Sequence, residues 1–246
     1  MDKNLDKTLL TICPSRGRPD IITEMIKSFA ETRGDNTDLL IYVDELDPTK
    51  SKYLEMIEPF ILERGITLQF GPRLHIVEVY NKFSNEHSYN YYAPINDDHV
   101  FLTYHWDEKL IKVVETSGGG WGLAMADDLL TDFTTSMHPS GCVISGNIIR
   151  ALGYMVWPKL HHIGTDTFLQ KICQGVNRLF LVKDVIIEHR HWLNGRRPLD
   201  DNYKWVYGGE EQRYGAYAIS NYLYNHLPDD IEKLRAAMTM TRIKND

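Results

Sequence analysis

Two adjacent carboxylates and a histidine follow an apolar, aromatic run in the stretch YAPINDDHVF, residues 92–101. The run is typical of a strand, so Asp97, Asp98 and His99 are expected at a strand end. Two interpretations fit these residue types. Asn and Asp form turns through their own side-chain hydrogen bonds. Adjacent carboxylates also repel each other, and a cation that both contact can hold them together, so the stretch is also a candidate metal site.

The segment CPSRGRP, residues 13–19, follows another predicted strand. Pro14 and Gly17 favour a tight loop, and Arg16 and Arg18 offer forked donors that suit a diphosphate. The proline that closes the segment fits the first turn of a helix, whose N-terminus also favours anions. A solvated basic turn is the alternative interpretation.

Other polar or aromatic residues follow predicted strands. In VDELDP, Asp44 can accept hydrogen bonds from a base or ribose, or can cap the next helix. In GGGWGLAMADDLL, residues 118–130, Trp121 is either a platform for a sugar ring or a core aromatic. Asp127 and Asp128 repeat the paired-acid pattern, and either contact sugar hydroxyls or cap a helix.

Two later segments carry candidate catalytic groups. In LHHIGTDTFLQKICQG, residues 160–175, Asp166 stands at the start of a predicted helix. It is either a helix cap or a carboxylate base at the mouth of a crevice. In RLFLVKDVIIEHRHW, residues 178–192, two β-rich stretches end in His189 and His191. On a strand these two side chains would point to opposite faces, so only one is expected to join a given site.

Length and composition are those of an ordinary globular protein. The chain has 246 residues, 43% hydrophobic and 25% charged, with a net charge of −7, which argues against a dedicated duplex nucleic-acid binder. Neither a signal peptide nor an apolar run of about 20 residues is evident, so a cytoplasmic protein without a membrane span is expected. The wide spacing of the cysteines predicts buried thiols, not disulfides or a zinc site; they are Cys13, Cys142 and Cys173.

Short apolar strands alternate with helical stretches through the first half of the chain. The pattern predicts strands at 8–13, 39–44 and 66–70, and helices at 19–31, 48–63 and 76–88. This alternation favours an α/β fold with a largely parallel sheet covered on both faces. Ligands of such sheets bind at the carboxyl ends of the strands, where residues distant in sequence converge.

In this order, the segments resemble the nucleotide-sugar glycosyltransferases of the GT-A fold, especially the family 2-like enzymes, from Leu9 to about Trp192. Their nucleotide-binding first loop is similar to CPSRGRPD. The end of their second strand, which carries the acid that binds the base, is similar to YVDELDP. INDDHVF is similar to the DxD-type element, with Asn96 where the first acid often stands. The acceptor-side strand, helix and catalytic acid of these enzymes are matched by GCVISGNIIRALG followed by GTDTFLQKICQG. Their closing strand, whose histidine completes the metal site, resembles VIIEHRH.

The resemblance implies roles at the matching positions. Asp166 would be the catalytic base, and Asp98 and His189 would bind Mn²⁺ or Mg²⁺. Asn96 removes one acid from the family pattern, which makes Asp98 more important for the metal. The implied donor-binding residues are Pro14, Ser15, Arg16, Arg18, Asp44, Asn96 and Asp97, and further candidates for sugar or acceptor contacts are Trp121, Asp127, Asp128 and His162.

The implied activity is metal-dependent transfer of a sugar from a nucleotide diphosphate sugar, a UDP-sugar first of all, to an acceptor hydroxyl with inversion. The acceptor stays open among a saccharide, a small molecule, a protein and a modified nucleobase. Two alternatives remain. One is a catalytically inactive nucleotide-sugar binder, which Asn96 suggests. The other is a metal-dependent hydrolase built from the acidic pair and the histidines, namely His161, His162, His189 and His191.

The implied GT-A catalytic domain, a Rossmann-like and mostly parallel sheet flanked by helices, covers residues 1–207. Near the end of this domain, the composition of residues 193–205 predicts a loop. The loop either closes over the diphosphate or is an ordinary surface loop without a role in binding. The pattern of residues 208–246 predicts one or two helices. These helices either pack on the same domain or provide the contact of a homodimer. Their apolar stripe consists of Tyr214, Tyr217, Ile219, Tyr222 and Leu223.

Overall fold

A mixed sheet forms the centre of the molecule in the computed structural model, which describes residues 8–61, 65–132 and 137–245. Within these residues the sheet has eight strands in the order β3-β2-β1-β4-β7-β6-β8-β5. Four pairs of neighbouring strands are parallel: β1–β2, β1–β4, β2–β3 and β6–β8. The pairs β4–β7, β5–β8 and β6–β7 are antiparallel. The strands are β1 (Leu9–Ser15), β2 (Thr37–Asp44), β3 (Ile66–Gly71), β4 (Tyr91–Pro94), β5 (His99–Phe101), β6 (Leu123–Asp127), β7 (Cys142–Ser145) and β8 (Leu179–His189).

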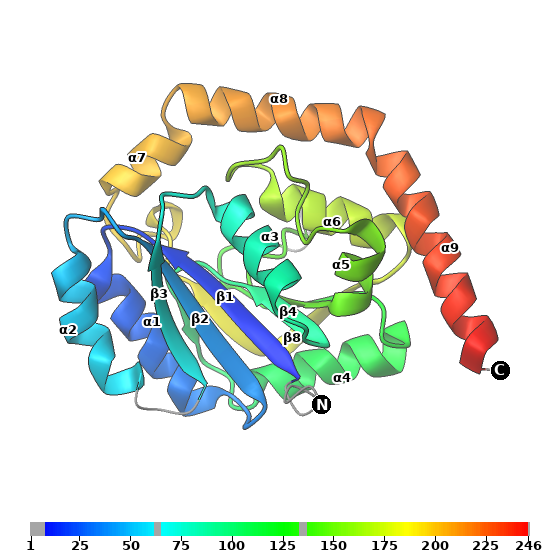
Figure 1. Cartoon of the computed structure of the whole chain (residues 1–246), viewed down its shortest axis with the longest axis horizontal. Helices are drawn as coiled ribbons and strands as arrows, with labels where there is room; N and C mark the ends of the chain where they lie inside the picture. Colours follow the sequence, from blue (N-terminus) through cyan, green and yellow to red (C-terminus); the bar gives the residue numbers. More distant parts are fainter. Residues whose placement is uncertain (1–7, 62–64, 133–136, 246) are drawn as a thin grey trace.

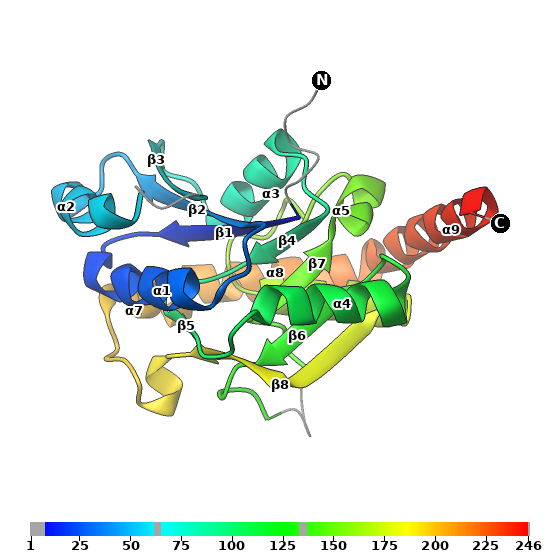
Figure 2. The ribbon, with the colours of Figure 1, turned by 90° about the horizontal axis from the view of Figure 1, so that it is seen from below.

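Helices cover both faces of this sheet (Figures 1 and 2). On one face lie α1 (Pro19–Thr32), α2 (Lys50–Ile61) and α4 (Trp106–Gly118). On the other lie α3 (Ile76–Glu86), α5 (Gly146–Leu152), α6 (Thr165–Gly175), α8 (Glu210–Asn225) and α9 (Leu227–Asn245). Figure 1 shows α7 (Asp201–Tyr207), α8 and α9 as an arch along one side of the molecule.

The strand sequences explain why both faces are covered. Successive side chains of β1 point to opposite faces, so Leu10 and Ile12 pack with α3 while Leu9 and Cys13 pack with α1. All four are buried. A strand that is apolar on both faces must be sandwiched between layers, which is the arrangement that parallel sheets adopt. The predicted α/β fold with its mostly parallel sheet is therefore confirmed.

The acid-bearing stretch contains two separate strands, which the sequence did not distinguish. β4 pairs with β1 in the middle of the sheet, whereas β5 pairs with β8 at its far edge. The chain crosses from one to the other through residues 95–98. The two carboxylates thus lie at the crossing point and not at the end of a single strand.

Two other predictions about the second half are wrong in detail. The two β-rich stretches between 178 and 192 form one continuous strand, β8. The segment expected as a loop, residues 193–205, runs into the helix α7. The side chain of Asp200 caps this helix by accepting a hydrogen bond from the Tyr203 N–H at 3.0 Å.

The C-terminal helices share the main core. Tyr222 of α8 and Leu234 of α9 are fully buried against the face that carries α5 and α6. Ile219 and Leu223 are partly buried there, but Tyr217 is 72% exposed, so the predicted stripe is narrower than the sequence suggested. None of the described helices combines the length and apolar composition needed to cross a membrane.

The close approach of α8 to the segment before α6 can be tested at Gly215. A Cβ added there would lie 2.4 Å from the Cβ of Ile163, too close for two carbon atoms. We expect Gly215→Val to lower the free energy of unfolding by about 1–3 kcal/mol, measured by urea denaturation. The matched control, Tyr217→Ala on the exposed side of α8, should change it by less than about 0.5 kcal/mol. Equal stability of the two variants would contradict this packing.

Candidate functional site

A cavity of about 670 Å³ lies at the carboxyl ends of β1, β2 and β4. Such a volume is typical of a small-molecule site. The loop after β1, the crossing between β4 and β5, the start of α6 and the end of β8 all contribute to its wall. Among its lining residues are eleven of the predicted site residues: Pro14, Ser15, Arg16, Arg18, Asp44, Asn96, Asp97, Asp98, His162, Asp166 and His189.

Three predicted residues lie elsewhere, and their placement corrects the sequence interpretation. Trp121 is 7% exposed and packs in the core with α3 and α5, so it offers no platform to the cavity. Asp127 and Asp128 end β6, and both carboxylates accept backbone N–H groups of the following turn. They hold a turn and do not cap a helix, because residues 129–131 that follow them form bends.

Asp97 is held by groups from the first loop. Its carboxylate accepts a hydrogen bond from Ser15 Oγ at 2.7 Å and is ion-paired with Arg18 at 2.9 Å. Arg18 also binds Asp200, the cap of α7, at 2.7 Å. Burial and the neighbouring Asp98 charge raise the pKa of Asp97, although Arg18 opposes this. Asp97 therefore ties the first loop to α7 through Arg18.

The carboxylate of Asp98 contacts residues of β5, β8 and α7. Its Oδ1 lies 3.3 Å from His189 Nε2 and 3.9 Å from His99 Nδ1, while its Oδ2 accepts a hydrogen bond from the Tyr203 hydroxyl. Burial would raise the pKa of Asp98, but the charges of His189, His99 and Arg18 hold it well below its ordinary value. Asp98 is thus a buried carboxylate that stays ionised.

The register between β5 and β8 explains this meeting. His99 stands directly opposite His189, and their rings stack with centroids 4.5 Å apart. Asp98 immediately precedes His99, so strand pairing brings its carboxylate beside the imidazole of His189. Ninety residues separate the two in sequence, and only this pairing joins them.

The residues around Asp98 fit a divalent cation. Its Oδ1 is buried and has no hydrogen-bond partner among the described residues, and it faces the ring nitrogen of His189. An oxygen and an imidazole nitrogen suit Mn²⁺, and oxygen ligands suit Mg²⁺. No group of three His, Cys, Asp or Glu ligands is assembled in the part of the chain that the structure describes. Within those residues, Asp98 and His189 are the two ligands that the protein would supply to such a cation.

The same observation weighs against the hydrolase interpretation. That interpretation needs several histidines and acids around one metal. Burial lowers the pKa values of His162 and His191 to about 4, so both are neutral, the form in which an imidazole can bind a metal. Over the described residues these histidines do not join the acidic pair in a three-ligand cluster.

Asp166 stands apart from the acidic pair. It occupies the first turn of α6, whose N-cap is Gly164, and its carboxylate makes no hydrogen bond within the described residues. It is therefore not a helix cap. Burial raises its pKa above the ordinary value of 3.8, and the charge of His189 only partly offsets this. A partly buried carboxylate with a raised pKa that lines a cavity is suited to accept a proton.

His189 and His191 both line the cavity, which contradicts the prediction that only one would join the site. β8 ends at His189, so strand alternation does not extend to His191. The backbone turns back there, with the His191 N–H bonded to the His189 carbonyl at 2.9 Å. The two rings then lie edge to face, 5.1 Å apart.

Asp44 and Arg16 form the outer part of the site. Asp44 accepts a hydrogen bond from the Leu46 N–H and lies 3.6 Å from Arg16 Nε. Asp44 does not cap α2. The turn before this helix is held by Asp47, which accepts from the Thr49 N–H and also from the Gly17 N–H of the first loop, both at 2.7 Å. Asp44 is left facing the cavity.

Several cavity residues escaped the sequence analysis. Tyr203 and Trp205 come from α7, and Arg73 and His75 come from the turn before α3. His161, which the sequence analysis considered only as a metal ligand of a hydrolase, also lines the cavity, from the segment before α6. Asp200 three residues before Tyr203 is an N-cap signal that could have revealed α7. Arg73 and His75 follow the third predicted strand, where a ligand-facing side chain was also to be expected.

The architecture agrees with solved structures of glycosyltransferases. The chain matches a mannosyltransferase, PcManGT from Pyrobaculum calidifontis in complex with GDP-Man and Mn²⁺, with TM-score 0.62 and 12% identity over 99% of this chain and 77% of that one. It matches S. aureus TarS 1–349 in complex with UDP-GlcNAc with TM-score 0.57 and 10% identity over 90% and 73%. In a longer TarS structure, the match covers 89% of this chain and 44% of the other. By sequence, the chain matches no protein-family model and no curated protein.

These similarities show the fold class: the chain has the GT-A fold of nucleotide-sugar glycosyltransferases. At identities of 10 to 12% they do not extend to the reaction, and function must be argued from the site itself.

The buried charges around Arg18 give a direct test of this site. Arg18→Met removes the cation that faces Asp97 and Asp98 and leaves two adjacent buried carboxylates. We expect a loss of about 3–5 kcal/mol in the free energy of unfolding at neutral pH. Arg16→Met is the matched control, because the Arg16 side chain is 44% exposed and its loss should cost less than about 1 kcal/mol. Similar losses in the two variants would show that Arg18 does not neutralise the pair.

Proposed function

We propose that this protein is a metal-dependent glycosyltransferase that moves a sugar from a nucleotide diphosphate sugar, a UDP-sugar, to an acceptor hydroxyl with inversion. One observation carries the proposal. A single cavity holds an ionised carboxylate whose buried Oδ1 lies 3.3 Å from a histidine nitrogen, Asp98 with His189, and a second carboxylate on another element, Asp166. One can hold a cation and the other can accept a proton.

The donor would occupy the edge formed by the first two strands. Arg16, at the rim and 44% exposed in its side chain, has a guanidinium able to bind phosphate oxygens. Asp44 would accept hydrogen bonds from the base or ribose. Both Asp97 oxygens already accept hydrogen bonds from Ser15 and Arg18, so its role would be to hold the first loop in place.

Asp98 and His189 would hold Mn²⁺ or Mg²⁺. When bound, such a cation stabilises the negative charge that develops on the departing diphosphate. Tyr203 contributes a hydrogen bond to the second oxygen of Asp98 and thereby orients the carboxylate. Because Tyr203 belongs to α7, the segment predicted to close over the diphosphate already contacts the site.

Asp166 would act as the base. An acceptor hydroxyl is a poor nucleophile until a base takes its proton. Asp166 lies on α6 and the acidic pair between β4 and β5. For inversion, Asp166 would have to meet the sugar from the side opposite the departing diphosphate. A single displacement of this kind inverts the anomeric centre.

The metal assignment is tested by donor binding. We expect one of the uridine, guanosine, cytidine and thymidine diphosphate sugars to raise the melting temperature in the presence of Mn²⁺. Asp98→Ala should weaken that binding by calorimetry about tenfold or more, each tenfold being ~1.4 kcal/mol. Asp127→Ala, which removes a carboxylate outside the cavity, is the control and should bind as the wild type does. Binding by Asp98→Ala with unchanged metal dependence would remove Asp98 from the metal site.

The base is tested by turnover and its pH dependence. Asp166→Asn preserves the shape of the side chain but cannot accept the proton, so transfer should fall roughly 100- to 10,000-fold while donor affinity stays constant. In the wild type, activity should fall as the pH drops through the raised pKa of Asp166, because the base works only when ionised. That acid limb should lie above pH 3.8 and vanish in the variant. Full turnover by Asp166→Asn would contradict the assignment.

A cytoplasmic location belongs to the same proposal. The three cysteines are buried and free, which fits a reducing compartment. A homodimer through the C-terminal helices stays a prediction. The large apolar side chains exposed there are Tyr214, Tyr217, Tyr224, Met240 and Ile243. Sedimentation of the purified protein would test the contact.

A further inference from the structure

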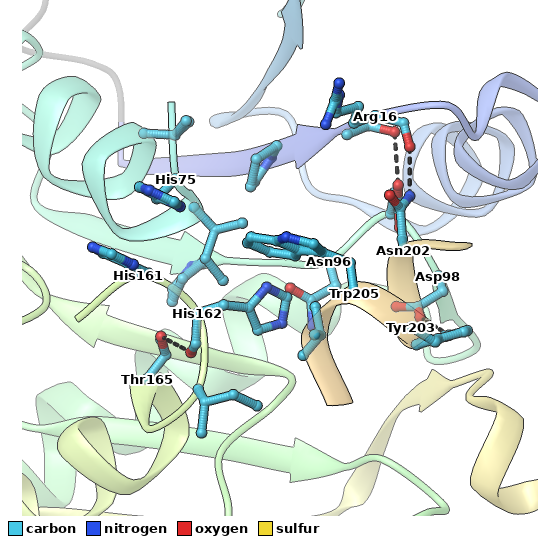
Figure 3. Close-up of a pocket in the computed structure, with 18 of the residues that line it drawn as sticks. Arg16, His75, Asn96, Asp98, His161, His162, Thr165, Asn202, Tyr203 and Trp205 are labelled. Carbon is cyan, nitrogen blue, oxygen red and sulfur yellow. Dashed lines mark hydrogen bonds between the residues drawn. The ribbon is translucent and has the colours of Figure 1, made fainter. Parts of the chain in front are cut away.

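The cavity has two chemically different ends. One end carries Arg16, Asp44 and Asp98, the charged groups assigned above to donor and metal. The other end carries two imidazoles and an indole, His75, His161 and Trp205, here called the aromatic wall. Figure 3 shows His75 and His161 at one side of the cavity and Arg16 and Asp98 at the other. The donor assignment uses none of the aromatic wall.

The rings of the aromatic wall are fixed by stacking. His75 and His161 stack almost in parallel, with centroids 3.9 Å apart and planes 2° apart. Tyr214 of α8 stacks on His161 at 4.2 Å, and Trp205 lies 6.2 Å from His75 at 15°. His75 is further held by a capping box with Glu78, which accepts the His75 N–H at 2.7 Å. Rings from four separate elements thus form one stack, in which His75 and His161 cover each other's faces and offer their ring edges to a ligand.

This surface is not made for an anion. Glu211, 8% exposed, places Oε2 3.5 Å from His161 Nδ1, and its Oε1 has no hydrogen-bond partner among the described residues. Glu78 lies beside His75. Arg73, two residues before His75, also lines the cavity, so a phosphate group of a nucleic acid or a polyol-phosphate chain would face charges of both signs and gain little net attraction. Hydroxyl groups, in contrast, can donate to a carboxylate and accept from an imidazole.

The indole of Trp205 adds an apolar face to the polar groups of the aromatic wall. It is 44% exposed although it lines the cavity, so it can be covered by a ligand. A sugar ring presents a flat apolar face of C–H groups and a rim of hydroxyls, which matches an aromatic face surrounded by polar groups. Trp205 is therefore placed to pack against a ring whose hydroxyls reach the histidines.

The aromatic wall is also connected to the proposed base. His161 and Asp166 belong to the same segment, in which Thr165 Oγ1 bonds the carbonyl of His162 at 2.7 Å. Both residues line the one cavity. A ring held on the wall would present its hydroxyls toward the carboxylate of Asp166.

We infer that the aromatic wall is the acceptor subsite and that the acceptor is an uncharged saccharide. This inference rests on the proposed glycosyltransferase function and names the substrate class that it would use. Trp205 packs on the acceptor ring, and His75 and His161 bind its hydroxyls.

The test separates donor use from acceptor use. Release of nucleotide from the donor identified by thermal shift is first measured with water alone. It is then measured with neutral tetrasaccharides of glucose, mannose, galactose or N-acetylglucosamine, with a polyol-phosphate polymer, and with DNA containing 5-hydroxymethylcytosine. We expect a neutral tetrasaccharide to accelerate release, and its glycosylated product to appear by mass spectrometry.

Variants then locate the subsite. Trp205→Ala should raise the KM for the saccharide about three- to tenfold, the effect of losing one aromatic contact, and Trp205→Phe should raise it less. The KM for the donor should change by less than about twofold in both. Tyr217→Ala, which removes an exposed aromatic outside the cavity, is the matched control and should leave both constants unchanged.

Three outcomes overturn the inference. Acceleration only by the polyol-phosphate polymer or the DNA would show a charged acceptor and leave the glycosyltransferase proposal intact. An unchanged saccharide KM in Trp205→Ala, or an increase confined to the donor KM, would place the acceptor elsewhere. Failure to bind or consume any nucleotide sugar would remove the proposed function itself, and the acceptor subsite with it.

Discussion

The organisation of the site depends on the burial of two adjacent carboxylates. Asp97 and Asp98 are only 5% and 2% exposed. Two charges this close repel each other and lose most of their hydration, so the fold must supply compensating groups. Arg18 comes from the loop after β1, His189 from the end of β8 and Tyr203 from α7. Each of these contacts fixes one wall of the cavity, and the acidic pair thereby positions three elements at once.

This compensation is incomplete in a way that bears on function. Asp97 is fully occupied, whereas one oxygen of Asp98 remains without a hydrogen bond among the described residues. The pair therefore divides into a structural member and a member with capacity for a ligand. Asp166, on another helix, has neither an ion pair nor a hydrogen bond there, and its pKa is raised by burial. The same cavity thus contains a carboxylate that is kept ionised and a carboxylate whose pKa is raised, two different environments for the same chemical group.

Much of the fold could be predicted from local pattern. The helix α1 and strands β1 to β3 lie close to their predicted positions because apolar alternation and Pro19 define them. α7 was missed because seven residues rich in polar and aromatic side chains carry little periodicity. Trp121 was ambiguous because a tryptophan after three glycines is equally compatible with a core and a surface. Only the packing of α3 and α5 over it places it in the core.

The sequence by itself determined that the chain forms an α/β sheet, because the strands and helices follow from the periodicity of apolar residues. It also determined that polar residues stand at the strand ends, because the residue types next to each strand can be read directly. It also determined that Asp97, Asp98 and Asp166 were the acids to consider. The tertiary structure alone decided which partners they have. The pairing of β5 with β8 places His189 beside Asp98, and the docking of α7 brings Tyr203 and Trp205 into the cavity. Asp98 lies 91 positions before His189 and 105 before Tyr203, and no local pattern of the chain encodes contacts over such a separation.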